Sequence, residues 1–144
     1  MMSRLKSTIA LLVLAVWPQL GLGAEMYAIV NAPTSASLDE ASLLALLKGQ
    51  RRNWDDGNAA TVVLPSRESN DFEIVAQHVF GASGRMMQRL WFRVVFSGRA
   101  NAPTYIDDPS DVIAAVEAKA GAVGVVVAVE EPEVEGSLRV VRLK

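Results

Sequence analysis

Short runs of apolar residues alternate along this chain with longer stretches in which apolar residues recur every three or four positions. Continuous apolar runs are typical of buried β-strands, and the longer spacing is typical of helices that bury one face. The strand-like runs lie at 26–30, 61–64, 122–129 and 138–143. The helix-like stretches lie at 38–47, 72–80, 86–95 and 112–120. This alternation predicts a layered α/β domain with crossover connections.

Signals at the ends of these stretches refine the prediction. Ser37 and Glu40 have the spacing of a capping box before the first helix. Ser110 or Asp111 is expected to cap the last helix. The stretch 99–109 between the last two helices is polar, and we expect it to be a loop.

The run at 122–129 contains only valine, alanine and glycine. A strand with no polar face is typically covered on both faces, as in a parallel sheet. Helices on both sides of such a sheet would give three layers. We therefore expect a single three-layer α/β lobe, with no linker or internal repeat that would mark a second domain.

The first residues have the order of a secretory signal peptide: basic residues, an apolar run at 9–17, then small residues up to Ala24. The apolar run is shorter than the roughly 20 residues that a membrane-spanning helix needs. We expect residues 1–24 to be a signal peptide cleaved near Gly23 or Ala24, leaving 25–144 as one exported, periplasmic domain. A retained N-terminal anchor is the alternative interpretation.

Composition argues against nucleic acid and membrane surfaces as partners. The formal net charge is −2 and basic residues are scattered, so there is no electrostatic footprint for nucleic acid. We also expect no basic, apolar helix face of the kind that binds a membrane surface. The chain has no cysteine, so its stability must come from its apolar core.

Four segments of the chain carry a resemblance to known proteins: 46–57, 63–72, 91–99 and 121–124. In their order and spacing they resemble the phosphate-binding-protein-like (PBP-like) family of periplasmic solute receptors. The resemblance covers nearly all of the chain after Ala24. It implies one lobe of a type II periplasmic binding protein, a small oxyanion such as phosphate as ligand, and an ABC permease or another periplasmic protein as partner.

The resemblance also implies a ligand-binding loop at Ser66, Arg67, Ser69 and Asn70. Elementary chemistry agrees, because a helix N-terminus offers free N–H groups and an arginine donates two parallel hydrogen bonds to an oxyanion. Asn31 is a further candidate, since it follows the first strand, where open α/β sheets present their ligands. Asn before Ala-Pro is more often turn chemistry, which is the alternative interpretation.

The same loop supports a different interpretation. Ser69 or Asn70 can simply cap the helix, with Glu73 reaching back to it. Glu68 and Asp71 would repel a multivalent anion, and the chain has Ser-Asn-Asp where well-known family members have Ser-Gly-Thr. The alternative function is therefore a periplasmic protein-interaction module that keeps the fold and has lost its ligand.

The remaining candidate residues have simpler explanations. Trp54 is expected to pack in the lobe, with contact to a partner as the alternative, and Met86 and Met87 are expected to fill the core. Arg99 is expected to be an exposed loop residue. His78 is the single histidine, and the sequence has no metal-ligand spacing, phosphate-binding loop or nucleophile motif. We expect no enzyme activity, no cofactor and no metal.

Overall fold

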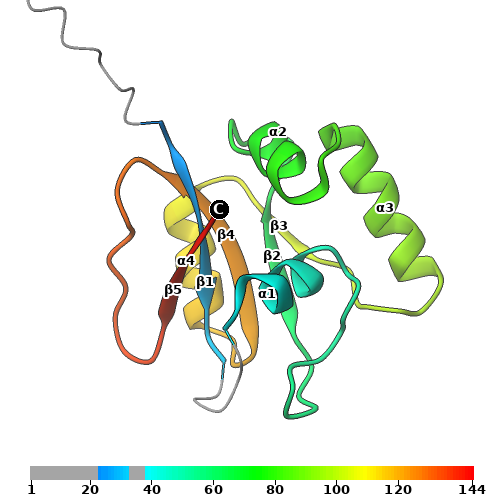
Figure 1. Cartoon of the computed structure of the whole chain (residues 1–144), viewed down its shortest axis with the longest axis horizontal. Coiled ribbons are helices and arrows are strands. Elements are labelled where there is room, and N and C mark those ends of the chain that lie inside the picture. The colour runs from blue at the N-terminus through cyan, green and yellow to red at the C-terminus, as the bar shows by residue number, and fades with distance from the viewer. Residues whose placement is uncertain (1–22, 33–37) are drawn as a thin grey trace, which may run out of the picture.

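The computed structural model of the chain describes residues 23–32 and 38–144 (Figure 1). Residues 1–22 of the predicted signal peptide, and the predicted cap Ser37, lie outside the described residues. Within the described ranges, no helix is long and apolar enough to cross a membrane.

The described residues form one sheet and several helices. The strands are β1 (Glu25–Val30), β2 (Thr61–Pro65), β3 (Thr104–Ile106), β4 (Ala122–Ala128) and β5 (Arg139–Leu143). The helices are α1 (Glu40–Leu47), α2 (Phe72–Val75), α3 (Gly84–Phe96) and α4 (Pro109–Glu117). A π-helical segment, η1 (Ala76–Phe80), continues α2 and ends at Gly81 in the left-handed conformation, which glycine adopts most easily.

The strands lie side by side in the order β3-β2-β4-β1-β5. β2 runs parallel to β3 and β4, whereas β1 runs antiparallel to β4 and β5. The parallel pairing expected for the run at 122–129 is therefore found between β4 and β2 only. The other neighbour of β4, β1, is antiparallel to it, so the sheet is mixed.

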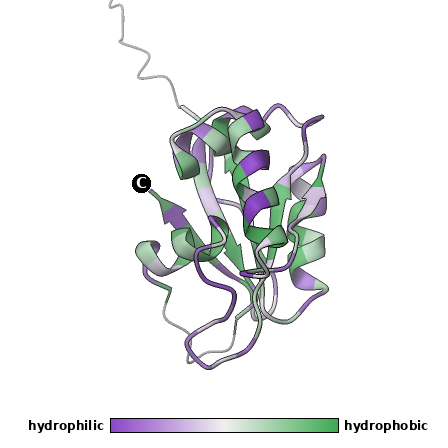
Figure 2. Cartoon of the chain, turned by 90° about the vertical axis from the view of Figure 1, so that its right-hand side faces the viewer, coloured by the Kyte–Doolittle hydropathy of each residue, from purple (hydrophilic) through white to green (hydrophobic). Residues whose placement is uncertain are grey.

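Helices cover both faces of this sheet. On one face, α1, α2 and α3 bury Leu46, Val75 and Trp91 against Val123 and Val125 of β4. On the other face, α4 packs through a second apolar cluster; its central members are Val112, Val116, Ile29 and Val126. Hydrophobic residues accordingly follow the strands inside the molecule (Figure 2). The predicted single three-layer α/β lobe is confirmed.

Several local predictions are wrong. Asp39 caps α1 by accepting a hydrogen bond from the Ser42 N–H group, and Glu40 instead accepts one from the Lys144 N–H group at 2.8 Å. Asp108 caps α4, because Pro109 suits the first helical position and has no N–H to satisfy. The expected loop at 99–109 contains β3.

Two apolar side chains expected on buried helix faces are instead exposed. Ile74 is 46% exposed and Met86 is 42% exposed, whereas Phe72 and Met87 are buried as predicted. Both exposed residues lie on helices that cover the same face of the sheet, on the sides of α2 and α3 that do not join its core.

Candidate functional site

The predicted ligand loop begins where β2 ends. β2 and β3 are parallel, so the segments that follow them emerge at the same edge of the sheet. The Ser66 N–H group donates to the Ile106 carbonyl at 2.9 Å, and the Ser66 hydroxyl donates to the Asp107 carboxylate. These contacts join the segment after β2 to the segment after β3 and form a polar cluster at the sheet edge.

Hydrogen bonds within the loop engage both serine hydroxyls. Ser66 Oγ also accepts from the Glu68 N–H group at 3.2 Å, and Ser69 Oγ accepts from the Asp71 N–H group at 3.1 Å. Asp71 precedes α2 and makes no side-chain capping bond. The Ser69 hydroxyl thus accepts a backbone N–H group at the start of the helix, as the capping alternative expects, whereas the expectation that Glu73 reaches back to this cap is wrong.

Glu73 has a different partner. Its carboxylate accepts a hydrogen bond from the Gly84 N–H group at 2.9 Å, which connects α2 to the start of α3. Gly84 is buried, and a Cβ atom there would lie 2.2 Å from a ring carbon of Phe72. Glycine at this position allows α3 to approach α2 closely.

The other two loop candidates, Arg67 and Asn70, are exposed. Arg67 forms no ion pair with any residue that the structure describes. Desolvation by burial raises the pKa of Asp71 above its usual range. Hydrogen bonds from the Ser110 hydroxyl and N–H group lower the pKa of Asp108. The loop after β2 and the segment after β3 thus carry one arginine, Arg67, and the carboxylates of Glu68, Asp71, Asp107 and Asp108.

Asn31 lies away from this cluster. It follows Val30, which pairs with Val123 at the beginning of β4, whereas Ser66 follows the other end of β2. The Asn31 side-chain amide donates to the carbonyls of Val116, Glu117 and Lys119 at 2.9, 3.2 and 3.1 Å. The last carbonyls of a helix have no partners within the helix, so the Asn31 side chain caps the C-terminal end of α4.

Two other candidates also have defined environments. Trp54 is 3% exposed and its indole Nε1–H donates to the Gly121 carbonyl at 2.8 Å, so the expected packing role is confirmed. His78 Nε2 lies 3.0 Å from the Lys144 carbonyl oxygen. In the ranges 23–32 and 38–144, no histidine, aspartate and glutamate side chains group closely enough to hold a metal ion.

Arg99 lies away from the loop. Together with Lys48 and Arg93 it lines a cavity of about 310 Å³ beside the ends of α1 and α3. A larger hollow of about 410 Å³ follows the outer side of α3. Neither cavity includes a residue of the loop after β2.

Comparisons with known proteins find no matching family model and no matching curated protein. Among solved structures, an ABC-type phosphate transport receptor from Vibrio cholerae is similar, with a TM-score of 0.48 and 18% sequence identity. The alignment covers 85% of this chain and 47% of the receptor. The chain thus spans about half the length of that receptor.

Proposed function

We propose that this protein is a periplasmic solute-binding-like protein made of one receptor-like lobe, which binds phosphate or another small oxyanion for ABC-type transport. The observation that carries the proposal is the position of Ser66, Arg67, Ser69 and Asn70. They lie in the loop at the carboxyl end of β2, which Ser66 joins to the carboxyl end of the parallel strand β3, where α/β sheets present ligands. Arg67 is exposed and unpaired among the described residues, so its guanidinium is available to an oxyanion.

The carboxylates of the cluster restrict the ligand. Asp107 contacts the Ser66 hydroxyl and is a hydrogen-bond acceptor. An oxyanion that retains a proton donates to such an acceptor, whereas a fully ionised oxyanion does not. Hydrogen phosphate is therefore preferred over sulfate. Glu68 and Asp71 repel either anion, so we expect modest affinity.

A second candidate function is a periplasmic interaction module without a ligand. It is favoured by the hydrogen bonds of the loop, because Ser66 and Ser69 already bind neighbouring backbone and carboxylate groups. A loop whose hydroxyls are satisfied needs no oxyanion to complete it. Fold alone does not decide between these functions.

Thermal unfolding of the chain from Glu25 separates the two candidates. Phosphate, sulfate, small carboxylates and a neutral solute would be compared at fixed ionic strength. A ligand at 100 times its Kd stabilises a protein by about 2.7 kcal/mol, which raises the Tm by several degrees. The paired substitution Arg67→Ala with Ser69→Ala should abolish this rise, and Arg52→Ala, at another exposed arginine, should leave it unchanged.

A selective rise with phosphate that disappears in the paired variant would support the receptor function. No rise with any solute would reject it and favour the interaction module. An undiminished rise in the paired variant would assign the anion to another part of the protein.

A further inference from the structure

Helix α3 exposes two aromatic rings. Phe92 is 65% exposed and Phe96 is 76% exposed, and their ring centroids lie 4.6 Å apart. Phenylalanine is among the residue types most often buried. Exposed apolar surface of this kind, when contiguous and bordered by polar residues, marks an interaction site.

A groove adjoins these rings and extends the apolar surface. Its lining combines the outer side of α3 with the segment that enters the edge strand β3, and its volume is about 410 Å³. The lining residues are Gln88, Trp91, Phe92, Val95, Phe96, Ala102, Pro103 and Tyr105. Trp91 is 2% exposed, so it forms the buried base of the groove. Such a concave apolar surface suits a large apolar side chain.

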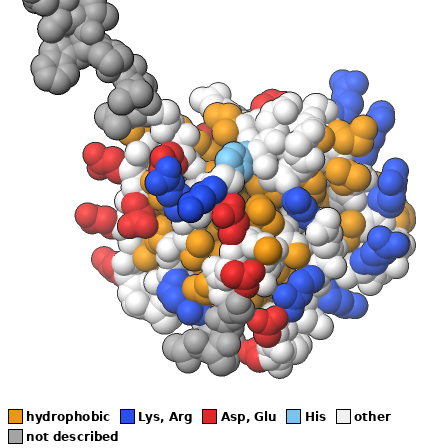
Figure 3. Space-filling view, in the orientation of Figure 1, with side chains coloured by type: hydrophobic (Ala, Val, Ile, Leu, Met, Phe, Trp, Pro, Cys, Tyr) orange, Lys and Arg blue, Asp and Glu red, His pale blue; other side chains and the backbone are white. Residues whose placement is uncertain are grey.

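Arginines border the aromatic part of α3. Arg85, Arg89 and Arg93 recur every four residues, so they follow one side of the helix. They line a second hollow of about 380 Å³, which shares Gln88 and Phe92 with the groove. Basic side chains accordingly gather on the side of the molecule where α3 lies (Figure 3). Helix α3 therefore has a basic, apolar face, whereas no helix face that binds a membrane surface was expected.

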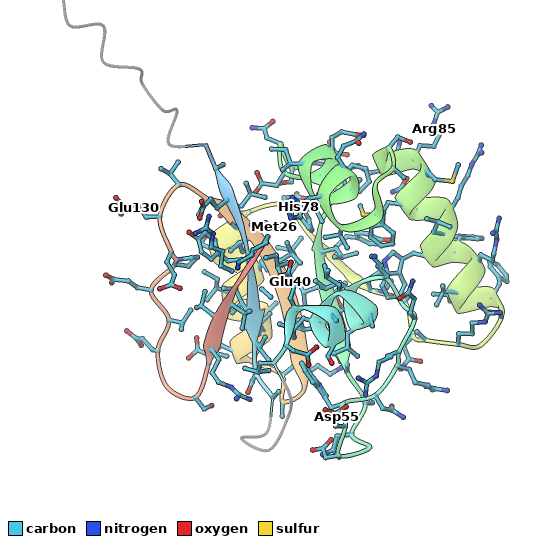
Figure 4. The ribbon with its side chains drawn as sticks, in the orientation of Figure 1. Met26, Glu40, Asp55, His78, Arg85 and Glu130 are labelled. Carbon is cyan, nitrogen blue, oxygen red and sulfur yellow. The ribbon has the colours of Figure 1, made fainter. Side chains whose placement is uncertain are left out.

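Within residues 23–32 and 38–144, these arginines have no acidic ion-pair partner. None of the three forms an ion pair with a residue that the structure describes. Arg85 projects away from the molecule, and the acidic segment that begins at Glu130 lies on the opposite side (Figure 4). The positive charge on α3 is therefore available to a molecule that binds from outside.

We propose that the outer face of α3 binds a carboxylate-rich segment of another protein, with an aromatic or large aliphatic side chain of that segment in the groove over Trp91. The charge complementarity of the arginines identifies the carboxylates, and the shape of the groove identifies the apolar anchor. This inference goes beyond the proposed anion site. It holds whether or not the loop after β2 binds an oxyanion.

The dimensions and charges of the face favour this occupant over others. From Arg85 to Phe96 the helix extends about 16 Å, which suits several residues of a polypeptide more than a compact solute. Two copies of the chain packed through α3 would bring their arginines together, which is unfavourable. The net charge of −2 opposes approach to an anionic membrane as a whole.

A random peptide library displayed on phage and selected on the immobilised chain tests this proposal. We expect the selected peptides to be enriched in aspartate and glutamate around an aromatic residue or leucine. Fluorescence anisotropy of one labelled selected peptide then gives its Kd. The Kd should increase about tenfold or more in Arg89→Glu with Arg93→Glu, and similarly in Phe92→Ser with Phe96→Ser. Added salt should weaken binding.

Matched controls use exposed residues outside α3. Arg52→Glu reverses another exposed arginine, and Ile74→Ser removes an exposed aliphatic side chain, and neither should change the Kd. The α3 substitutions replace exposed side chains, so thermal unfolding should show that all variants remain folded.

Several results would overturn the proposal. They are failure to select any peptide, selection without enrichment of acidic residues, and equal binding by the α3 variants. Dimerisation in sedimentation equilibrium that is lost in Phe92→Ser would assign the face to a second copy. Binding to vesicles of phosphatidylglycerol that is lost in the same variant would assign it to a membrane surface.

Discussion

The indole Nε1–H group of Trp54 donates to the carbonyl oxygen of Gly121 at 2.8 Å, and this bond joins two turns 67 residues apart in the chain. Trp54 lies in the segment before β2, and Gly121 lies in the turn from α4 into β4. Gly121 has φ +84°, and a Cβ atom there would lie 2.7 Å from the Ala59 carbonyl oxygen. The bond therefore holds two parts of the backbone that are already in close contact.

Substitution of the two buried tryptophans should have unequal effects. Trp54→Phe loses the bond to Gly121 and should lower the free energy of unfolding by about 1–3 kcal/mol. Trp91→Phe should cost less, because the buried Trp91 Nε1–H has no hydrogen-bond partner among the described residues. Urea denaturation measures both changes. Since both side chains are almost fully buried, an equal or larger loss in Trp91→Phe would contradict this explanation.

Gly121→Ala should be strongly destabilising for two reasons. Alanine is strained at positive φ, and its Cβ would press on the Ala59 carbonyl oxygen, so we expect a loss of about 2–4 kcal/mol. Gly136→Ala is the matched control, because Gly136 has φ +66° and no atom within 4 Å of the added Cβ. Thermal unfolding of both variants should show a clear excess for Gly121→Ala. Equal losses would mean that backbone strain alone determines the effect.

Most of the fold was predictable because its elements have local signals. The buried runs of β2 and β4, and Ser83 as the cap of α3, are visible in the sequence. β3 was not predictable, because it is a three-residue edge strand whose first two residues are exposed. The antiparallel direction of β1 was also not predictable, since strand direction depends on pairing between residues far apart in the chain.

The candidate sites were predictable to different degrees. The four loop residues lie close together because they are close in sequence. The contact of Ser66 with Asp107 could not be predicted, because it depends on the parallel pairing of β2 and β3. The exposed face of α3 was not predicted, because Phe92 and Phe96 do not belong to the apolar spacing that indicates the buried face of this helix. The spacing of Phe92 and Phe96 beside Arg89 was the available signal.

Substitution of Asn31 should affect stability and leave anion binding unchanged. Asn31→Ala removes the donors to the last carbonyls of α4, which should cost about 1–2 kcal/mol. Asn31→Asp should cost more at neutral pH, because a carboxylate would face carbonyl oxygens at the negative end of the helix. Urea denaturation gives the order of the two variants. Should either variant lose a phosphate-induced rise in Tm while remaining folded, Asn31 would belong to the ligand site.

The contributions of Asp71 and Asp108 to folding stability should change with pH in opposite directions. Burial raises the pKa of Asp71 in the folded state, so its charged form lowers stability at neutral pH, and this penalty disappears as pH falls through the folded pKa. Asp71→Asn should therefore raise the Tm at pH 7. The rise should become small below about pH 4, where the carboxylate of the original protein is protonated.

For Asp108 the sign is reversed. Hydrogen bonds from Ser110 lower its folded pKa, so its charged form adds stability above the unfolded pKa, and that contribution is lost as pH falls through the folded pKa. Asp108→Ala should lower the Tm at pH 7, with a smaller decrease in acid. Thermal unfolding of both variants from pH 7 to pH 3 measures the two trends. A shared sign would show that these separate environments do not determine how stability depends on pH.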